Sequence, residues 1–141
     1  MKKLILILLA AVAVISVSSI AFSEQAMSQN KVAVYYFHGT FRCSLCTMME
    51  KYFREAVETN FKDVFTSGKL EFKTVNVEGR GNEHFVHDYQ LYTKSLILSL
   101  VKDGKEVKSK NLDKIWEHVR NKQKFIDYVV GEINRFLKDV Q

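Results

Sequence analysis

Apolar and polar positions along the chain follow two different periods, which separate predicted strands from predicted helices. Residues 31–37 form a nearly continuous run of apolar, β-branched and aromatic side chains, which predicts a central strand buried on both faces. From Cys43 to about Gly68 the apolar residues recur at helical spacing with charges between them, which predicts an amphipathic helix of several turns. Residues 70–77 and 95–101 show two further strand patterns.

The second half of the chain adds a hairpin and a helical C-terminal region. The Asp-Gly pair at 103–104 is a strong hairpin turn signal, and residues 106–110 fit the returning strand. A short helix is expected over 82–89, and an apolar stripe over 126–140 predicts the last helix. The order β-α-β-α-β-β-α predicts a mixed sheet, with parallel neighbours joined through helices and an antiparallel edge from the hairpin.

The first 23 residues differ from everything that follows. A basic start leads into an uninterrupted apolar run, Leu4–Ile15, and then into small and apolar residues. This pattern predicts a secretory signal peptide over 1–23, a short polar segment over 24–30 and one domain over 31–141. The apolar run is also long enough to span a bilayer as an uncleaved anchor, so both outcomes stay open. In either case the domain is expected outside the cytoplasm, in the periplasm or another extracytoplasmic space.

Composition and charge narrow the class of protein. The chain is 26% charged and 47% hydrophobic, which is an ordinary balance for a folded domain. Without Lys2 and Lys3 the formal net charge falls from +5 to +3, and the remaining basic residues are interleaved with acidic ones. Nucleic acid is therefore not expected as a partner. The 2 Cys are too few for a disulfide-stapled miniprotein or a four-cysteine zinc site, and the chain has no Pro.

The two cysteines form a C-x-x-C motif, Cys43-Ser-Leu-Cys46, where the first strand pattern gives way to the helix. At a helix N-terminus, free N–H groups and the helix dipole stabilise the thiolate of Cys43, and Arg42 adds a nearby positive charge. A thiolate is the attacking species in disulfide exchange, and Cys46 lies about one turn further on. Metal binding and a purely structural disulfide remain open, but a bridge that closes so short a loop restrains little chain entropy.

Other side chains are weaker candidates. His38 could stabilise the Cys43 thiolate as a cation or accept its proton as a base, and it could equally be a loop residue with local hydrogen bonds. Together with Cys43 and Cys46 it would also form a three-ligand site for a soft metal such as copper. The aromatic residues in the C-terminal region are expected in the core: Trp116, Phe125 and Phe136.

The stretch 32–50 resembles the thioredoxin-like superfamily, in which a strand, a short loop, a C-x-x-C motif and an amphipathic helix follow one another. Residues 74–78 look like the family's second central strand with its acidic end, and residues 89–104 resemble its passage from helix to strand and hairpin. The resemblance covers about residues 31–141. It implies a three-layer α/β/α sandwich around a mixed four-stranded sheet.

The resemblance also implies a chemistry. Cys43 would be the nucleophile and Cys46 the resolving thiol, the substrates would be protein or small-molecule thiols and disulfides, and the redox-active disulfide would need no further cofactor. Arg42 stands where thioredoxins usually have Trp. No carboxylate occupies the family's buried position, which falls near Tyr36 or Phe37, so water or Glu50 would have to assist proton transfer.

The missing proline marks a further departure from the family pattern. The family places a cis-proline beside the cysteines, and the matching stretch here is Thr93-Lys94-Ser95-Leu96. A cis bond without proline costs about 2.5–4 kcal/mol, so we expect a trans bond and a differently shaped substrate groove. Thr93, Lys94 and Ser95 are therefore candidate supporting residues.

These observations predict an exported thiol-disulfide oxidoreductase that a membrane or periplasmic partner resets. A copper-handling thioredoxin-like protein is one alternative. The other is a non-catalytic subunit of a membrane redox complex. The sequence is similar to an exported bacterial subgroup labelled nitrophenyl compound nitroreductase subunit, which would imply that role, although nothing in the residues suggests a flavin or nicotinamide site. The direction of exchange depends on a reduction potential that the sequence does not provide.

Overall fold

The computed structural model describes residues 30–140. The predicted signal peptide and almost all of the polar segment lie outside the described residues. Within the described part of the chain, no helix has the length and apolar character that crossing a membrane requires.

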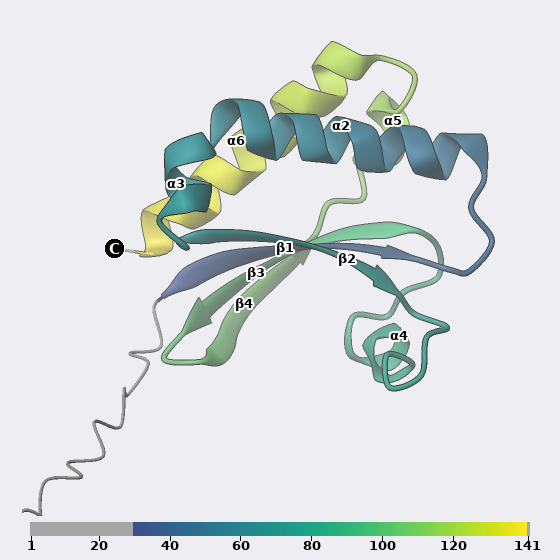
Figure 1. Ribbon diagram of the computed structural model, residues 1–141, viewed down its shortest axis with the longest axis horizontal. Coiled ribbons are helices and arrows are strands. Elements are labelled where there is room, and N and C mark those ends of the chain that lie inside the picture. Colours follow the sequence, from purple (N-terminus) through teal and green to yellow (C-terminus); the bar gives the residue numbers. More distant parts are fainter. Residues whose placement is uncertain (1–29, 141) are drawn as a thin grey trace, which may run out of the picture.

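Four strands form one mixed sheet in the order β2-β1-β3-β4 (Figure 1). The strand β1, Lys31–His38, pairs in parallel with β2, Leu70–Asn76, and antiparallel with β3, Ser95–Lys102. The strand β4, Lys105–Asn111, pairs antiparallel with β3. The predicted strands and the mixed sheet are therefore confirmed, and each strand lies within two residues of its predicted bounds.

The hairpin turn is the one that the Asp-Gly pair predicts. Asp103 and Gly104 have φ of 50° and 76°, so both residues lie in the left-handed region. Asp tolerates this region better than most residues and Gly adopts it without steric cost, which is why the pair makes a tight two-residue connection.

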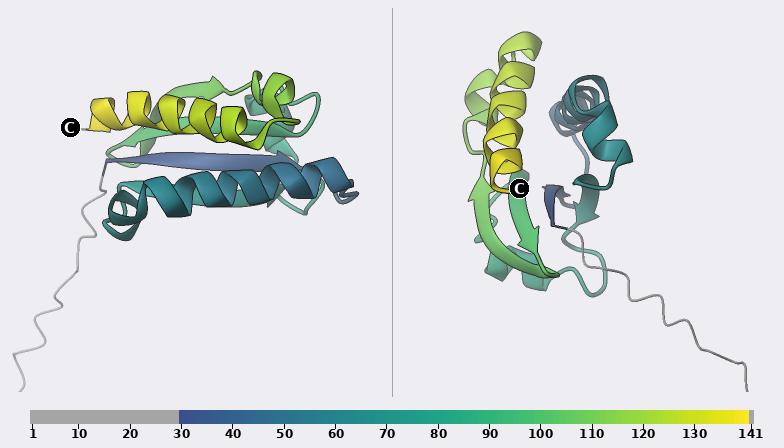
Figure 2. Two further views of the ribbon diagram at one scale, coloured as in Figure 1. Left: turned by 90° about the horizontal axis from the view of Figure 1, so that it is seen from above. Right: turned by 90° about the vertical axis from the view of Figure 1, so that its left-hand side faces the viewer.

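The two long helices lie on the same face of the sheet (Figures 1 and 2). They are α2, Ser44–Asn60, and α6, Lys122–Leu137. The continuous helix predicted to about Gly68 is wrong, because a second helix, α3, Lys62–Thr66, follows a break at Phe61. Phe61 leaves the helical region with φ −130° and ψ 25°, and its side chain is buried in the core. Burying this aromatic ring outweighs helix continuation at that point.

The main core fills the space between the sheet and the long helices. It contains alternate residues of the two central strands together with one face of each helix: Val32, Val34, Tyr36, Leu96, Leu98, Met49, Phe53, Phe125, Val129 and Ile133. Because successive side chains of a strand point to opposite faces, the intervening residues belong to the other side of the sheet. The buried apolar face of α2 is what holds its N-terminus against the end of β1.

The opposite face carries a thinner layer. A short helix, α4, His84–Asp88, covers a small cluster that contains Phe37, Leu91 and Ile97. The arrangement is the predicted α/β/α sandwich, in which α4 is the one helix of the described chain that lies below the sheet in Figure 1.

The C-terminal region joins the hairpin to α6 through a short helix, α5, Ile115–His118, and ends in a 3-10 helix, Lys138–Val140. Phe125 and Phe136 are buried as predicted, whereas the prediction for Trp116 is wrong, because its side chain is exposed. Consecutive side chains of a helix point about 100° apart, and α5 directs Ile115 rather than Trp116 into the core.

Candidate functional site

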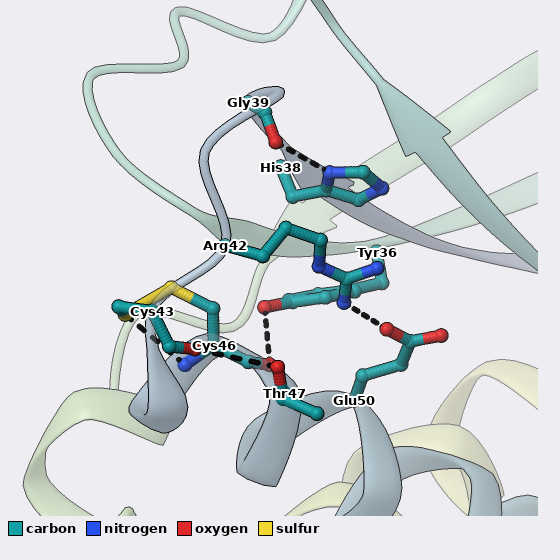
Figure 3. Close-up of a disulfide and its surroundings, with 8 residues drawn as sticks. All are labelled: Tyr36, His38, Gly39, Arg42, Cys43, Cys46, Thr47 and Glu50. Atoms are coloured by element: carbon teal, nitrogen blue, oxygen red, sulfur yellow. Dashed lines mark hydrogen bonds and ion pairs between the residues drawn. A yellow bond between two sulfur atoms is a disulfide. The ribbon is translucent and has the colours of Figure 1, made fainter.

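The two cysteines form a disulfide at the N-terminus of α2 (Figure 3). Cys43 is the N-cap residue of the helix, and its sulfur accepts a hydrogen bond from the N–H of Cys46 at 3.3 Å. The first four N–H groups of a helix have no partner inside the helix, so a sulfur at this position satisfies one of them. The predicted location of the motif, directly after the central strand and at the head of the helix, is confirmed.

The two sulfurs lie in different surroundings. Cys43 is partly exposed, whereas Cys46 is 1% exposed and belongs to the buried face of α2. The backbone carbonyl of Cys46 accepts a hydrogen bond at 2.9 Å from the hydroxyl of Tyr36, which lies on β1. A group that approaches from solvent therefore meets Cys43 first, and Cys46 is held from behind by the sheet.

Tyr36 is a site residue that the sequence argument missed as a hydrogen-bond donor. Its side chain is buried, and burial raises its pKa to about 12, because desolvation disfavours the charged phenolate more than the nearby Arg42 favours it. The hydroxyl consequently keeps its proton over the physiological range and remains a donor to Cys46. A tyrosine on a central strand, near the position at which the resemblance implies a carboxylate, was the available signal.

The Arg42 side chain, expected to add a positive charge near Cys43, pairs with a carboxylate. Its guanidinium bonds the Glu50 carboxylate and lies 6.0 Å from the centroid of the Tyr36 ring (Figure 3). Glu50 also lies 3.5 Å from the guanidinium of Arg54 and accepts a hydrogen bond from the Thr74 hydroxyl at 3.5 Å. The positive charge of Arg42 is thus paired with the Glu50 carboxylate, which lies about two helical turns along α2 from Cys43.

The loop between β1 and Cys43 is held by the end of β2. The N–H of Thr40 donates to the Glu78 carboxylate at 2.8 Å, and the Asn76 amide donates to the Thr40 hydroxyl at 3.1 Å. The hydrogen bonds from Thr40 hold the pKa of Glu78 below its usual value. A Cβ at Gly39 would stand 2.9 Å from Glu78 Oε1, so the glycine allows this close approach. The acidic end of the second strand was the only sequence signal for this anchor.

A cavity of about 160 Å³ brings together three of the predicted supporting residues, His38, Thr93 and Lys94. His38 ends β1, and its Nδ1–H donates a hydrogen bond to the Gly39 carbonyl oxygen at 2.8 Å. Ser95 is buried, and its hydroxyl donates to the Thr93 carbonyl at 3.0 Å. Ser95 therefore supports the backbone of this stretch and does not line the cavity.

The stretch Thr93-Lys94-Ser95-Leu96, which contains no proline, has the expected backbone. No peptide bond within residues 30–140 is cis, so the bonds around Thr93 and Lys94 are trans as predicted. With respect to the alternative metal site, no group of three or more His, Cys, Asp and Glu side chains in the same part of the chain is placed to hold a metal ion. Cys43 and Cys46 are bonded to each other, and His38 has the Gly39 carbonyl as its neighbour.

The strand order, the helix order and the disulfide at the head of α2 define a thioredoxin-like α/β fold with a C-x-x-C pair. No family model matches the sequence, and no curated protein matches it.

Solved structures of thioredoxins are similar to the chain at low identity. Thioredoxin f2 of Chlamydomonas reinhardtii is 14% identical with a TM-score of 0.41, over 68% of this chain and 82% of that one. The Schistosoma mansoni thioredoxin pre-protein is 19% identical with a TM-score of 0.41, over 67% and 82% of the two chains. Mitochondrial thioredoxin 3 of Saccharomyces cerevisiae, in its oxidized form, is 17% identical with a TM-score of 0.38, over 68% and 83%. The fold assignment stands on the topology.

Proposed function

We propose that this protein is a thiol-disulfide oxidoreductase that works outside the cytoplasm through Cys43 and Cys46. The proposal rests on the difference in solvent exposure between the two cysteines. Cys43 is partly exposed at a helix N-terminus, and Cys46 is buried behind it and tied to β1 through Tyr36. Exchange through a mixed disulfide needs one thiol that the substrate reaches and a second that only the first one reaches.

The first step is attack by the Cys43 thiolate. The N–H of Cys46 and the positive end of the α2 dipole stabilise that thiolate, and the first turn of α2 contains no acidic residue to oppose them. The thiolate forms a bond to one sulfur of the substrate disulfide. The substrate S–S bond breaks, and the second substrate sulfur leaves as a thiolate that takes up a proton from solvent.

The second step resolves the mixed disulfide. The Cys46 thiol gives up its proton, its sulfur bonds to the sulfur of Cys43, and the remaining substrate group leaves as a thiol. The substrate disulfide has then gained two electrons, and the Cys43–Cys46 pair has lost two. The same steps in reverse oxidise a substrate dithiol, and the reduction potential decides the direction.

The surroundings of Cys43 suit a thiol or disulfide carried by a protein or a small molecule. The cavity lined by His38, Thr93 and Lys94 lies at the end of the sheet from which the loop to Cys43 starts. Phe41 in that loop is 80% exposed, and Tyr92 before β3 is 93% exposed. These exposed aromatic side chains give an incoming substrate apolar contact area. The N-terminal sequence pattern supports export, and a redox partner at the membrane would return the pair to its working state.

A redox titration tests the proposal. The purified domain is equilibrated in glutathione buffers of varied poise, alkylated, and analysed for the state of both cysteines. We expect a two-electron transition within the physiological range. A Cys46→Ser variant should accumulate mixed disulfides with its substrates, and a Cys43→Ser variant should not. If both cysteines keep one state across the whole range, the protein does not exchange disulfides.

A further inference from the structure

Arg42 directly precedes Cys43 in the chain, yet its side chain forms an ion pair with a residue of α2. Its guanidinium bonds the carboxylate of Glu50, and Figure 3 shows it lying over the Tyr36 ring with the disulfide off to one side. The Nε of Arg42 is buried and has no hydrogen-bond partner among the residues that the structure describes. A buried donor without a partner is costly, so the contact with Glu50 is what holds the guanidinium in this place.

Glu50 is itself fixed from two sides. Arg54 lies one helical turn along α2 with its guanidinium 3.5 Å away, and the Thr74 hydroxyl of β2 donates at 3.5 Å. Its side chain is 19% exposed and that of Arg42 is 31% exposed, so solvent screens this ion pair less than a fully exposed one. Two further ionisable side chains come from β1: Tyr36, whose ring the Arg42 guanidinium overlies, and His38, whose ring lies 6.0 Å from that of Tyr36.

The position of Arg42 decides how much of its charge Cys43 feels. A free guanidinium beside a thiol favours the thiolate, whereas a carboxylate in contact with that guanidinium cancels much of its field. We infer that Glu50 is a positioning residue: it holds Arg42 over Tyr36 and away from Cys43, so that the thiol of Cys43 is less acidic than it would be beside a free arginine. The inference rests on the proposed role of Cys43 as the nucleophile. A less acidic thiol stabilises the reduced form less, which makes the pair a better reductant.

The test is the pH dependence of Cys43 alkylation in the reduced protein, in a Cys46→Ser background so that only one thiol titrates. We expect Glu50→Gln to shift the alkylation profile down by about 0.5 unit, which is about a threefold rise in rate below the pKa. Glu58→Gln is the matched control. Glu58 also pairs with Arg54, at 3.7 Å on the same helix, and within residues 30–140 Arg54 is its one ion-pair partner. It should leave the profile unchanged.

A second background shows whether Glu50 acts through Arg42. In an Arg42→Gln protein, Glu50→Gln should no longer shift the profile, because the Arg42 guanidinium is no longer there to be released toward Cys43. An equal shift with and without Arg42 would mean that Glu50 acts on the thiol by its own charge, and it would overturn the inference. The absence of any shift in Glu50→Gln would overturn it as well.

A Glu50→Asp variant distinguishes the effect of the negative charge at position 50 from the effect of the contact with Arg42. It also provides a test if the Glu50→Gln variant folds poorly. Aspartate keeps the negative charge but is one methylene too short for the bond to Arg42, so it should shift the profile in the same direction as glutamine. A wild-type profile in Glu50→Asp would contradict the inference. Alkylation does not require disulfide exchange. An Arg42-dependent shift in a protein that exchanges no disulfides would therefore overturn the proposed function and support this inference.

Discussion

The two cysteines have different surroundings: apolar core packs behind Cys46, and a loop held by polar contacts lies in front of Cys43. The difference predicts which substitutions affect the stability of the fold and which affect the reactivity of the thiols. Behind Cys46 lies the main core, with Met49 and Phe53 on the same buried face of α2 and the Tyr36 hydroxyl on the Cys46 carbonyl. In front of Cys43 lies a loop held by polar contacts, in which Thr40 bonds Glu78. Changes behind the pair should therefore cost folding free energy, whereas changes in front should alter reactivity and leave the fold in place.

The largest effect is expected from a cavity behind the pair. Phe53 is fully buried and packs against Tyr36 and Phe125 with ring centroids 5.5 and 4.9 Å apart. Phe53→Ala should lower the free energy of unfolding by about 3–5 kcal/mol. Phe41→Ala, in the exposed front loop, is the control and should stay within about 0.5 kcal/mol of wild type. Urea denaturation measures both, and equal losses in the two variants would break the contrast.

A smaller effect is expected from the hydrogen bond that ties Cys46 to β1. Tyr36→Phe keeps the ring and removes the donor, which leaves the buried Cys46 carbonyl without this partner. The free energy of unfolding should fall by about 1 kcal/mol, and alkylation of Cys46 in the reduced protein should become faster. If neither the free energy of unfolding nor the alkylation rate of Cys46 changes, the hydrogen bond from Tyr36 does not hold Cys46 in place.

The same variant makes a pH-dependent prediction. The pKa of Tyr36 is raised from 10.0 to about 12 in the folded protein. Its contribution to stability is therefore fully present below pH 10 and is lost as the pH rises toward 12. Wild type should lose more stability than Tyr36→Phe over that window in parallel urea titrations. Parallel losses would mean that the hydroxyl is not held in its neutral form by burial.

The smallest effect on stability is expected in front of the pair. Glu78→Ala removes the acceptor of the Thr40 N–H, so the hydrogen-exchange protection of that amide should fall several-fold, with little change in the urea midpoint. In wild type the pKa of Glu78 is lowered, so the anchor persists at neutral pH and is lost only as the pH falls through that lowered value. If the hydrogen-exchange protection of the Thr40 amide is the same in the variant and in wild type, Glu78 does not anchor this loop.

Local signals in the sequence predicted much of the fold. The strand patterns, the Asp103-Gly104 turn and the place of the C-x-x-C motif each depend on a few neighbouring residues, and all three are confirmed. The break at Phe61 and the exposure of Trp116 were missed, because each depends on which side chain finds room in the assembled core.

The contacts of the site were less predictable than its motif. Arg42 pairs with Glu50, eight positions away, and Thr40 bonds Glu78 in the turn that follows β2. Sequence spacing places Arg42 next to Cys43, but it does not show in which direction a long side chain points. The ion-pair partner of a long charged side chain such as Arg42 can therefore be determined only from the tertiary structure.

The two sulfurs differ in their access to solvent, and limited alkylation of the fully reduced wild-type protein measures that difference. Mass spectrometry after a short exposure to iodoacetamide should find Cys43 modified about tenfold or more faster than Cys46. Equal rates, or faster modification of Cys46, would contradict the account of an exposed attacking thiol in front of a buried resolving one.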